Sequence, residues 1–375
     1  ATLSNYINNI FSSVENKLII LGLFIDYSKA FDCVSHTILL QKLERYGFHG
    51  VALEWFQSYL SNRTQRVACA STTISDSKIV TVGVPQGSIL GPTLFNIFTN
   101  DLASYIEASC NILQVNFADD ANFLITGKDP ISIFNVVRTL YERISVWSNK
   151  NKLIINKDKT TCVLFDEHTF LVKDIQDVLK TINVNLTIRQ HTKMLGIFLD
   201  HKLSWISHID YVCNKLSQVC FMLKNASLHC NKDILKSLYF GCFQSVLMYG
   251  VVHWYRSTAT ETIRVFRIQK WALRILVGIR RRDSCRPFFK KEKILTLVSL
   301  YLYQVLCYAF KNRSHFATCG QGHQYETRNK DLLLPNRHRT SRYQKSLLFS
   351  ACKVFNCLPM SVKDTTSITI FKKKV

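Results

Sequence analysis

The amino-acid sequence predicts a mixed α+β fold whose second half is mainly helical. Up to about residue 200, short apolar runs bounded by turn residues alternate with helical patterns, whereas from about 205 to 310 the apolar residues recur mainly at helical spacing. The charge is divided in the same way. Residues 1–200 hold 18 Lys+Arg and 18 Asp+Glu, but residues 201–375 hold 30 and 8, so the net charge of +22 belongs to the second half. The 375 residues, 47% of them hydrophobic, are enough for about two or three globular domains.

The first expected element is a strand over residues 18–25, LIILGLFI. A continuous apolar run of this length is typical of a strand buried on both faces, and it places Asp26 at the C-terminal end of that strand. Helical patterns follow at 35–46 and 50–60, before a polar stretch with β propensity that reaches Val82. The apolar run is far too short to cross a bilayer, so we expect no membrane contact.

Residues 83–95, GVPQGSILGPTLF, predict a turn followed by the start of a helix. Pro85 and Gly87 fix an unusual backbone path in the turn, and Pro92 suits the first turn of the helix. The next apolar segments lie on either side of an acidic pair and predict a β-hairpin.

That acidic pair, Asp119 and Asp120, is expected in the tight turn of the hairpin. Adjacent carboxylates raise each other's pKa, so such a pair persists at a strand end mainly where a cation lies beside it, and a divalent metal ion is the obvious candidate. An antiparallel sheet that sets this hairpin beside the first strand would bring Asp26 to the pair. Because most Asp-Asp dipeptides are turn residues or helix caps, the dipeptide alone is a weak signal.

The rest of the chain predicts a helix at 131–149, a strand, turn and strand at 152–165, and a compact turn at 200–202. Helices follow to about 310, and beyond 311 the chain is polar, basic and weakly patterned. Aromatic residues are interleaved with the cations of the second half, which favours nucleic-acid contact over a basic protein that is merely soluble.

The thirteen cysteines are scattered without a C-x2-C pair, so neither a zinc ribbon nor a disulfide framework is indicated. We expect free thiols in an intracellular, reducing compartment. No signal peptide is visible, and because the first residue is Ala1 rather than Met, we expect the chain to derive from a longer protein.

Five blocks, in this order and spacing, resemble the active-site blocks of reverse transcriptases. They are most similar to the polymerases of non-long-terminal-repeat retrotransposons, the LINE-like and jockey-like elements of animals. The similarity is specific from about residue 18 to 210 and looser to about 360. The five blocks are FIDYSKAFD, GVPQGSILGPTLF, NFADD, LIINKDKTTCVLF and KMLGIFLDHKLSWISHI.

The resemblance implies the fold of a right-hand polymerase: an α+β palm with an antiparallel sheet, followed by a helical thumb and a basic C-terminal region. On this basis residues 1–185 would form the palm, with partial fingers at 48–82 between the first two blocks. Residues 186–210 would form a primer-grip hairpin, 211–310 the thumb and 311–375 the basic C-terminal region. Further fingers and an endonuclease would lie upstream in the full-length protein.

The resemblance also implies a metal centre with two Mg²⁺ ions, for which Mn²⁺ could substitute. Asp26 and Asp119 would ligate both ions, with the backbone carbonyl of Tyr27 as an additional ligand, and Asp120 would complete the acidic cluster. Hard cations of this kind take carboxylates together with substrate phosphates, which explains Asp rather than His or Cys at these positions.

Four further positions match residues that handle the nucleotide in this family. Phe31 would stack under the sugar and exclude a 2′-OH, and Gln86 would contact the incoming nucleotide while Gly87 permits close backbone approach. Lys159 would protonate the departing pyrophosphate. The alternatives are a core aromatic at 31, a polar turn at 86–87 and a solvated turn lysine at 159.

In the second half, Leu195 and Gly196 match the primer grip, which would hold the 3′-OH in line with the α-phosphate. A basic run supplies candidate phosphate contacts, although a solvated charge run explains it nearly as well. The run is Arg280, Arg281 and Arg282. Three aromatic residues are more typical of helix cores than of base stacking: Trp254, Trp271 and Phe266.

The function expected from this resemblance is RNA-directed DNA polymerisation, in which deoxynucleotides are added to a DNA primer on an RNA template. The family context implies target-primed synthesis in the nucleus after a cytoplasmic ribonucleoprotein stage. One alternative is a catalytically defective relic that still binds nucleic acid. Another is a palm-type nucleotidyl cyclase, for which the Gln86 turn and the primer-grip hairpin would have no evident purpose.

Overall fold

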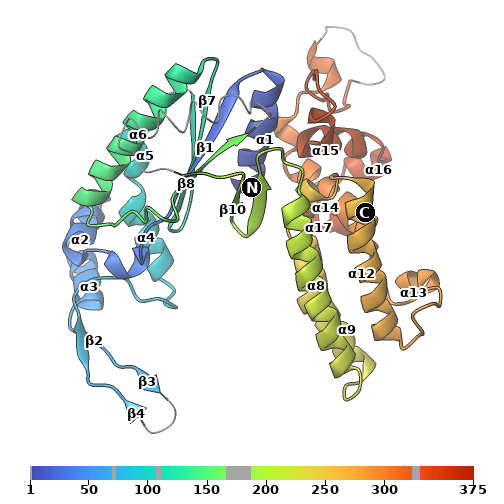
Figure 1. Cartoon of the computed structure of the whole chain (residues 1–375), viewed down its shortest axis with the longest axis horizontal. Helices are drawn as coiled ribbons and strands as arrows, with labels where there is room; N and C mark the ends of the chain where they lie inside the picture. Colours follow the sequence, from blue (N-terminus) through green and yellow to red (C-terminus); the bar gives the residue numbers. More distant parts are fainter. Residues whose placement is uncertain (1, 70–72, 107–110, 166–186, 323–329) are drawn as a thin grey trace. The chain divides into compact units, whose positions relative to one another are not determined.

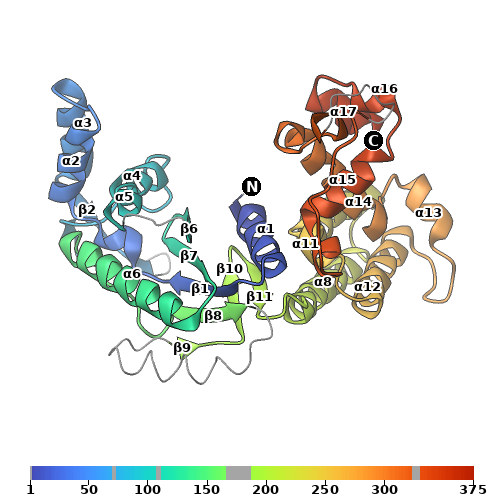
Figure 2. The same cartoon turned by 90° about the horizontal axis from the view of Figure 1, so that it is seen from above.

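The computed structural model describes residues 2–69, 73–106, 111–165, 187–322 and 330–375. The chain divides into two compact units (Figures 1 and 2). We call Lys17–Gln190 the sheet unit, and Ala1–Asn16 together with His191–Val375 the helical unit. The fold is therefore mixed α+β, as predicted.

The sheet unit is built on a five-stranded sheet in the order β6-β7-β1-β8-β9. The central strand, β1, pairs antiparallel with β7 and β8, and β6 pairs antiparallel with β7. The strands are β1 (Ile19–Ile25), β6 (Ile112–Phe117), β7 (Asp120–Gly127), β8 (Thr161–Phe165) and β9 (Thr187–Ile188).

The edge strand β9 runs parallel to β8, so the sheet is mixed and the prediction of a purely antiparallel sheet is wrong at this edge. A parallel neighbour needs a crossover of about a dozen residues or more. Residues 166–186 provide that length between the two strands.

Helices cover one face of this sheet (Figures 1 and 2). The alternate residues Leu21, Leu23 and Ile25 of β1 belong to one core with apolar residues of the helices, and each such burial stabilises the fold by roughly 1.5–3 kcal/mol. The helices of the unit are α2 (His36–Arg45), α3 (Val51–Leu60), α4 (Gly91–Thr99), α5 (Leu102–Ile106) and α6 (Pro130–Lys150), with a 3-10 turn at Ala30–Cys33. Two small antiparallel ribbons complete it, β2 (Arg63–Gln65) with β5 (Lys78–Val80) and β3 (Ala68–Cys69) with β4 (Thr73–Ile74).

An ion pair between the buried Lys42 and the partly exposed Asp101 ties these helices together. Lys42 of α2 donates to the carboxylate of Asp101 at 2.8 Å and to the carbonyl of Phe98 at 2.6 Å. The indole N–H of Trp147 on α6 donates to the same Asp101 oxygen at 3.3 Å. Burial lowers the pKa of the Lys42 ammonium, and the hydrogen bond to Asp101 opposes that effect. The pair therefore links three separate helical segments through groups that satisfy one another.

The helical unit contains the hairpin of β10 and β11 and two long helices, α8 and α12, which lie side by side (Figures 1 and 2). Its strands are β10 (His191–Met194) and β11 (Ile197–Asp200). Its helices are α1 (Thr2–Glu15), α8 (Ile206–Ala226), α9 (Lys232–Leu238), α10 (Ser245–Met248), α11 (Val251–Trp254), α12 (Ala259–Val277), α13 (Arg286–Lys291), α14 (Leu297–Lys311), α15 (Leu347–Asn356), α16 (Met360–Lys363) and α17 (Ile368–Lys374). A π-helical turn at Tyr239–Gln244 joins α9 to α10, and short 3-10 turns occur at Arg313–His315, Cys319–Gly322 and Tyr343–Lys345.

The first helix, α1, groups with the helical unit rather than with the sheet, whereas the sequence places residues 1–185 in one palm. Several of its residues contact the helical unit, and its last residue makes the most distant contacts along the chain. The Glu15 carboxylate accepts hydrogen bonds from the backbone N–H groups of Arg339 and Thr340 and from the Thr340 hydroxyl. These partners are more than 300 residues away along the chain, so no local pattern indicates them.

The basic C-terminal region packs against α14. The ring of Phe371 on α17 is fully buried and stacks on that of Phe310 at 4.2 Å between centroids. Asn356 holds the preceding segment, since its side chain both accepts from the N–H of Leu333 and donates to its carbonyl.

Among the described helices, none combines the length and apolar character that a bilayer crossing needs. The described cysteines are free thiols.

Candidate active site

Acidic residues from β1 and from the β6–β7 hairpin meet at one end of the sheet. Ile25, the last residue of β1, pairs with Ala121, so the next residue in this register, Asp26, lies opposite Asp120. Asp119 occupies the two-residue turn between β6 and β7, whereas Asp120 is the first residue of β7, so the prediction that places the whole pair in the turn is wrong for Asp120. The antiparallel pairing thus brings together carboxylates that are distant in the sequence.

Strand alternation decides which way these side chains lie. Ile25 and Ala121 belong to the core beneath the helices, so their neighbours Asp26 and Asp120 lie on the other face of the sheet. The Asp26 side chain is 32% exposed, and Asp119 and Asp120 are partly exposed as well. The acidic cluster is therefore held by buried strands and open to solvent.

The electrostatics of the cluster show excess negative charge. Partial burial raises the pKa of the Asp120 carboxyl, and the charges of Asp119 and Asp26 raise it further. One cation lies close by, because Lys159 Nζ is 3.8 Å from Asp26 Oδ2. This lysine side chain is 69% exposed, so its contact with Asp26 is loose.

The loop that carries Lys159 is bonded directly to the end of β1. Asn156 donates its backbone N–H to the Asp26 carbonyl at 2.8 Å, and the Asp26 N–H approaches Thr160 Oγ1 at 3.4 Å. The Asn156 side-chain oxygen accepts from the N–H groups of Asp158 and Lys159, which closes the turn. Sequence reasoning overlooked Asn156, although Asn is typical of turns that are closed by their own side chain.

The hairpin turn is strained immediately before the acidic pair. Ala118 has a φ of 51°, in the left-handed region that costs a residue other than glycine roughly 1–2 kcal/mol. Strain of this kind persists where the surrounding structure fixes it, and it is concentrated at functional sites.

The acids do not form a closed metal cage. Among the described residues, no group of three or more His, Cys, Asp or Glu side chains is arranged to hold a metal ion. The donor set nevertheless suits Mg²⁺ or Mn²⁺, because these ions take one or two carboxylates and complete their coordination with phosphate and water oxygens. The raised pKa of Asp120 marks negative charge that a cation at this position would offset.

Tyr27 can contribute to this site only through its backbone. Its side chain is buried in the core, where its hydroxyl accepts a hydrogen bond from Ser148 at 3.3 Å, and burial raises the pKa of that hydroxyl to about 12. This agrees with strand alternation, since Tyr27 follows Ile25 on the core side.

The turn with Gln86 is joined to the chain that follows β1. Gln86 donates its side-chain N–H to the Asp32 carboxylate at 2.8 Å. Gly83 approaches the same segment so closely that a Cβ would lie 2.9 Å from the Asp32 carbonyl oxygen. Gly87 has a φ of +81°, which glycine adopts without strain, and a Cβ there would meet none of the described atoms within 4 Å. Sequence reasoning did not identify Asp32 as the partner of Gln86.

Phe31 has a fixed ring. It stacks on Phe95 of α4 with 4.5 Å between the centroids, and it packs against the core of the sheet unit. The backbone carbonyl of Phe31 accepts from Val84 at 2.9 Å, which links it to the turn that carries Gln86. The ring is half-buried, so both predicted roles, core aromatic and contact with a sugar, are compatible with its environment.

Leu195 and Gly196 form the turn of the β10–β11 hairpin in the helical unit. Both have positive φ values, 49° and 80°. The hydroxyl of Tyr249 donates to the Leu195 carbonyl at 2.5 Å, and its ring lies 3.6 Å from the position of a Cβ on Gly196. Tyr249 thus anchors the turn, and the sequence carries no local signal for this contact.

The three arginines follow α12, whose last residue is Val277. All three are exposed, and the backbone N–H of Arg280 is held by the Asp283 carboxylate at 3.0 Å. The aromatic residues of this region differ from one another. Trp254 is fully buried, as predicted, but Trp271 is 38% exposed, so its assignment to a helix core is wrong. Phe266 is half-buried and stacks on Phe289.

Comparison with known proteins agrees with these features. The family model described as "Reverse transcriptase (RNA-dependent DNA polymerase)" matches residues 8–199, about half of the chain. The RNA-directed DNA polymerase from the mobile element jockey of Drosophila melanogaster is 29% identical over 263 residues, which are 66% of this chain and 28% of that protein. The probable RNA-directed DNA polymerase from transposon BS of the same organism is 25% identical over 278 residues, 72% of this chain and 30% of that protein.

The chain thus spans about 30% of the length of these curated relatives. Among solved structures, that of apo telomerase from Candida tropicalis superimposes with a TM-score of 0.41 and 14% identity, over 80% of this chain and 50% of that one. This superposition is too weak to support an argument about the site.

Proposed function

Because the chain belongs to the reverse transcriptase family, we propose that it carries the nucleotidyl-transfer centre of an RNA-directed DNA polymerase from a non-LTR retrotransposon. The substrates would be a DNA primer, an RNA template and deoxynucleoside triphosphates. The observation that supports this most strongly is the meeting of Asp26, Asp119 and Asp120 at one end of the sheet, with Lys159 beside Asp26.

Asp26 and Asp119 would hold two Mg²⁺ ions, with the Tyr27 carbonyl as a further ligand and Asp120 next to them. When bound, such ions stabilise the attacking and leaving oxygens of a phosphoryl transfer. The contribution of the chain is to fix the carboxylates on paired strands, so that little reorganisation is needed when substrate arrives.

Lys159 would act as the general acid. The primer 3′-hydroxyl would lose its proton to water as its oxygen bonds to the α-phosphorus. The bond from that phosphorus to the pyrophosphate oxygen would break, and Lys159 Nζ would give its proton to the departing oxygen. The exposed side chain and its loose contact with Asp26 suit this role, because the ammonium can leave Asp26 and follow the pyrophosphate.

Selection of the nucleotide would involve Phe31 and Gln86. The Phe31 ring is held by Phe95, so it would present a rigid surface to the sugar and exclude a 2′-OH. The hydrogen bond to Asp32 orients the Gln86 amide next to Gly87. Phe31 lies in the segment that follows β1, and Gln86 lies in the segment that precedes α4.

We further assign the β10–β11 hairpin as primer grip, the helices up to about residue 310 as thumb, and Arg280, Arg281 and Arg282 as phosphate contacts. The protein would act in the nucleus by target-primed synthesis after a cytoplasmic ribonucleoprotein stage. In this assignment the full-length protein supplies further fingers and the endonuclease.

Primer extension tests the proposal directly. The chain is given an oligo(dT) primer on a poly(A) RNA template with Mg²⁺, and Asp119→Asn is compared with Asp76→Asn, which removes the same charge from an exposed loop of the same unit. We expect incorporation by the wild type and by Asp76→Asn but not by Asp119→Asn. Equal incorporation by both variants would overturn the proposal, and binding of the primer-template by a wild-type chain that extends nothing would support a relic instead.

A further inference from the structure

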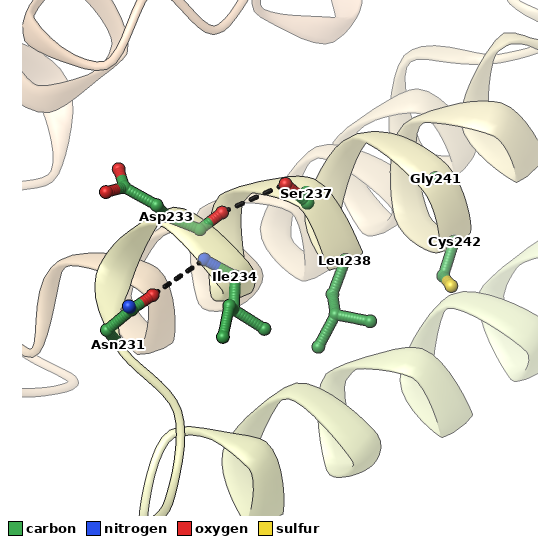
Figure 3. A pocket seen from close by; sticks show the side chains of 7 residues that line it. All are labelled: Asn231, Asp233, Ile234, Ser237, Leu238, Gly241 and Cys242. Atoms are coloured by element: carbon green, nitrogen blue, oxygen red, sulfur yellow. Dashed lines mark hydrogen bonds between the residues drawn. The ribbon is translucent and has the colours of Figure 1, made fainter.

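Among the hollows of the helical unit in the described part of the chain, two have opposite character. One, of about 450 Å³, lies along α9 and the π-helical turn (Figure 3). The surface of this hollow, to which Ile234 and Leu238 belong, is mainly apolar, and its one charged residue is Asp233. The other, of about 870 Å³, lies between the C-terminal ends of α8 and α12. We call the second hollow the α8–α12 groove.

The α8–α12 groove is lined by five cations and no acid. They are Lys224, Arg267, Lys270, Arg274 and Arg281. The three on α12 are spaced by three and four residues, which sets them on one face of the helix, where like charges repel by roughly 0.2–0.5 kcal/mol per pair. A face that costs stability in this way indicates a ligand of opposite charge.

The cations of the groove are not neutralised within the part of the chain that the structure describes. Arg274 donates to the backbone carbonyl of Asp283 at 3.1 Å, and Lys270 lies over the ring of Phe266. Neither contact offsets charge. One turn earlier on the same helix, Arg264 is paired with Asp210 at 2.8 Å and Glu261 at 2.5 Å. The contrast places the unpaired charge specifically at the C-terminal end of α12.

Trp271 adds an aromatic surface to this groove. It lines the hollow among isoleucines and is 38% exposed. A ring beside a row of cations suits an unpaired base whose phosphates lie on those cations. A duplex hides the faces of its bases, and an acidic peptide supplies charge without a ring to stack, so neither uses the tryptophan as well.

We propose that the α8–α12 groove binds single-stranded nucleic acid, with phosphates held by its cations and an unpaired base stacked on Trp271. The volume lies within the about 300–1,000 Å³ typical of sites that enclose a small organic ligand, so one or a few nucleotides occupy it. The site lies wholly within the helical unit and does not depend on polymerase activity. A chain that extends no primer still shows this binding.

The first test compares variants of the full chain by the fluorescence anisotropy of a labelled oligouridylate of about 12 nucleotides. Trp271→Leu weakens binding about 5- to 150-fold, as expected for the loss of about 1–3 kcal/mol of stacking, whereas Trp271→Tyr restores most of the affinity. Phe240→Leu is the matched control, since Phe240 is also 38% exposed but lies outside the groove. Equal losses in Trp271→Leu and Phe240→Leu overturn the proposal.

The ligand provides a second test that does not depend on the folding of a variant. With a strand whose central nucleotides lack bases, wild type and Trp271→Leu bind equally, and wild type binds this strand less tightly than the intact one. Trp271→Leu leaves the affinity for a duplex unchanged. If the wild type binds abasic and intact strands equally, or if Trp271→Leu weakens the duplex as much as the strand, no base is stacked there.

The third test concerns the cations. In Arg267→Gln/Arg281→Gln, the slope of log K against log salt becomes shallower by about 1.4, because each phosphate contact on a single strand contributes about 0.7. The control Lys290→Gln/Lys353→Gln removes the same charge from exposed positions outside the groove and keeps the wild-type slope. An equal change of slope in both double variants overturns the proposal. Polyglutamate provides a further check: if it displaces the labelled strand at the same charge concentration as unlabelled strand does, the proposal is also overturned.

Discussion

Two lysine–aspartate pairs in the sheet unit have the same chemistry and opposite surroundings. Lys42 and Asp101 are 2.8 Å apart, and the Lys42 side chain is only 9% exposed. Lys159 and Asp26 are 3.8 Å apart, with side chains that are 69% and 32% exposed. The first pair is closed by further hydrogen bonds from the core, whereas the second stands beside two more carboxylates.

The difference teaches how to separate a structural charge from a functional one. At Asp101 each charge is satisfied, and removing Asp101 leaves the Lys42 ammonium buried and without its counter-ion. At Asp26 the charges are unbalanced, and the pKa of Asp120 is raised by its partial burial and further by repulsion from Asp119 and Asp26. Unbalanced charge on paired strands is favourable only when a ligand of the opposite charge binds there.

The largest effect is expected for Asp26→Asn. If Asp26 holds catalytic cations, this change lowers the rate of primer extension by about 10³-fold or more, because the charge that positions them is lost. The free energy of unfolding stays within about 0.5 kcal/mol, since Asp26 is partly exposed and its pairing with Lys159 is weak. Primer extension and urea unfolding are measured on the same preparation. A large loss of stability would assign Asp26 to the structure rather than to catalysis.

The next largest effect is expected for Lys159→Met. Loss of a general acid costs about 10²-fold in the rate of extension. Unfolding is unchanged. The control is Lys157→Met, an exposed lysine in the same loop for which no described contact with Asp26 occurs. If both variants lose activity equally, Lys159 acts only through the local charge.

For the Lys42–Asp101 pair, we expect Asp101→Asn to lower the stability of the fold. We expect a loss of about 2–3 kcal/mol in the free energy of unfolding, below the about 3–5 kcal/mol of a fully buried pair because the Asp101 side chain is 42% exposed. Lys42→Met removes the charge and fills the same space, so it costs less than Asp101→Asn. Urea unfolding measures both, with Arg138→Gln as an exposed control from an ion pair. A cost for Lys42→Met that exceeds that of Asp101→Asn would show that the ammonium itself stabilises the helices.

The sequence predicted the parts of this site that depend on short-range pattern. The apolar run of β1 fixed Asp26 at a strand end, and the hairpin pattern put Asp119 in a turn. It did not predict the parallel pairing of β9 or the hydrogen bonds from Glu15, because both join segments that share no local signal. The exposure of individual side chains was the feature that the sequence predicted least well.

Trp271 illustrates why. An aromatic residue on an amphipathic helix is normally core, and only the neighbouring helix decides whether the face is covered. In α12 the cations at positions 267, 270 and 274 line the same hollow as Trp271, which stays 38% exposed. Composition indicated nucleic acid for the whole basic half, but the structure was needed to find the groove.

The smallest expected effect is a dependence of folding stability on pH, which tests whether the charge around Asp120 is unbalanced. The pKa of Asp120 is raised in the folded chain above its ordinary value of 3.8, so between these two values the folded state binds more protons than the unfolded state. Stability therefore falls as pH rises through that window and gains as pH is lowered. Thermal unfolding of wild type and Asp120→Asn at a series of pH values isolates the effect, because the variant lacks the titrating group. We expect the stability of wild type relative to the variant to decrease with rising pH. An increase would mean that the folded chain stabilises Asp120 as an anion. That result would contradict the excess negative charge on which the assignment of this site depends.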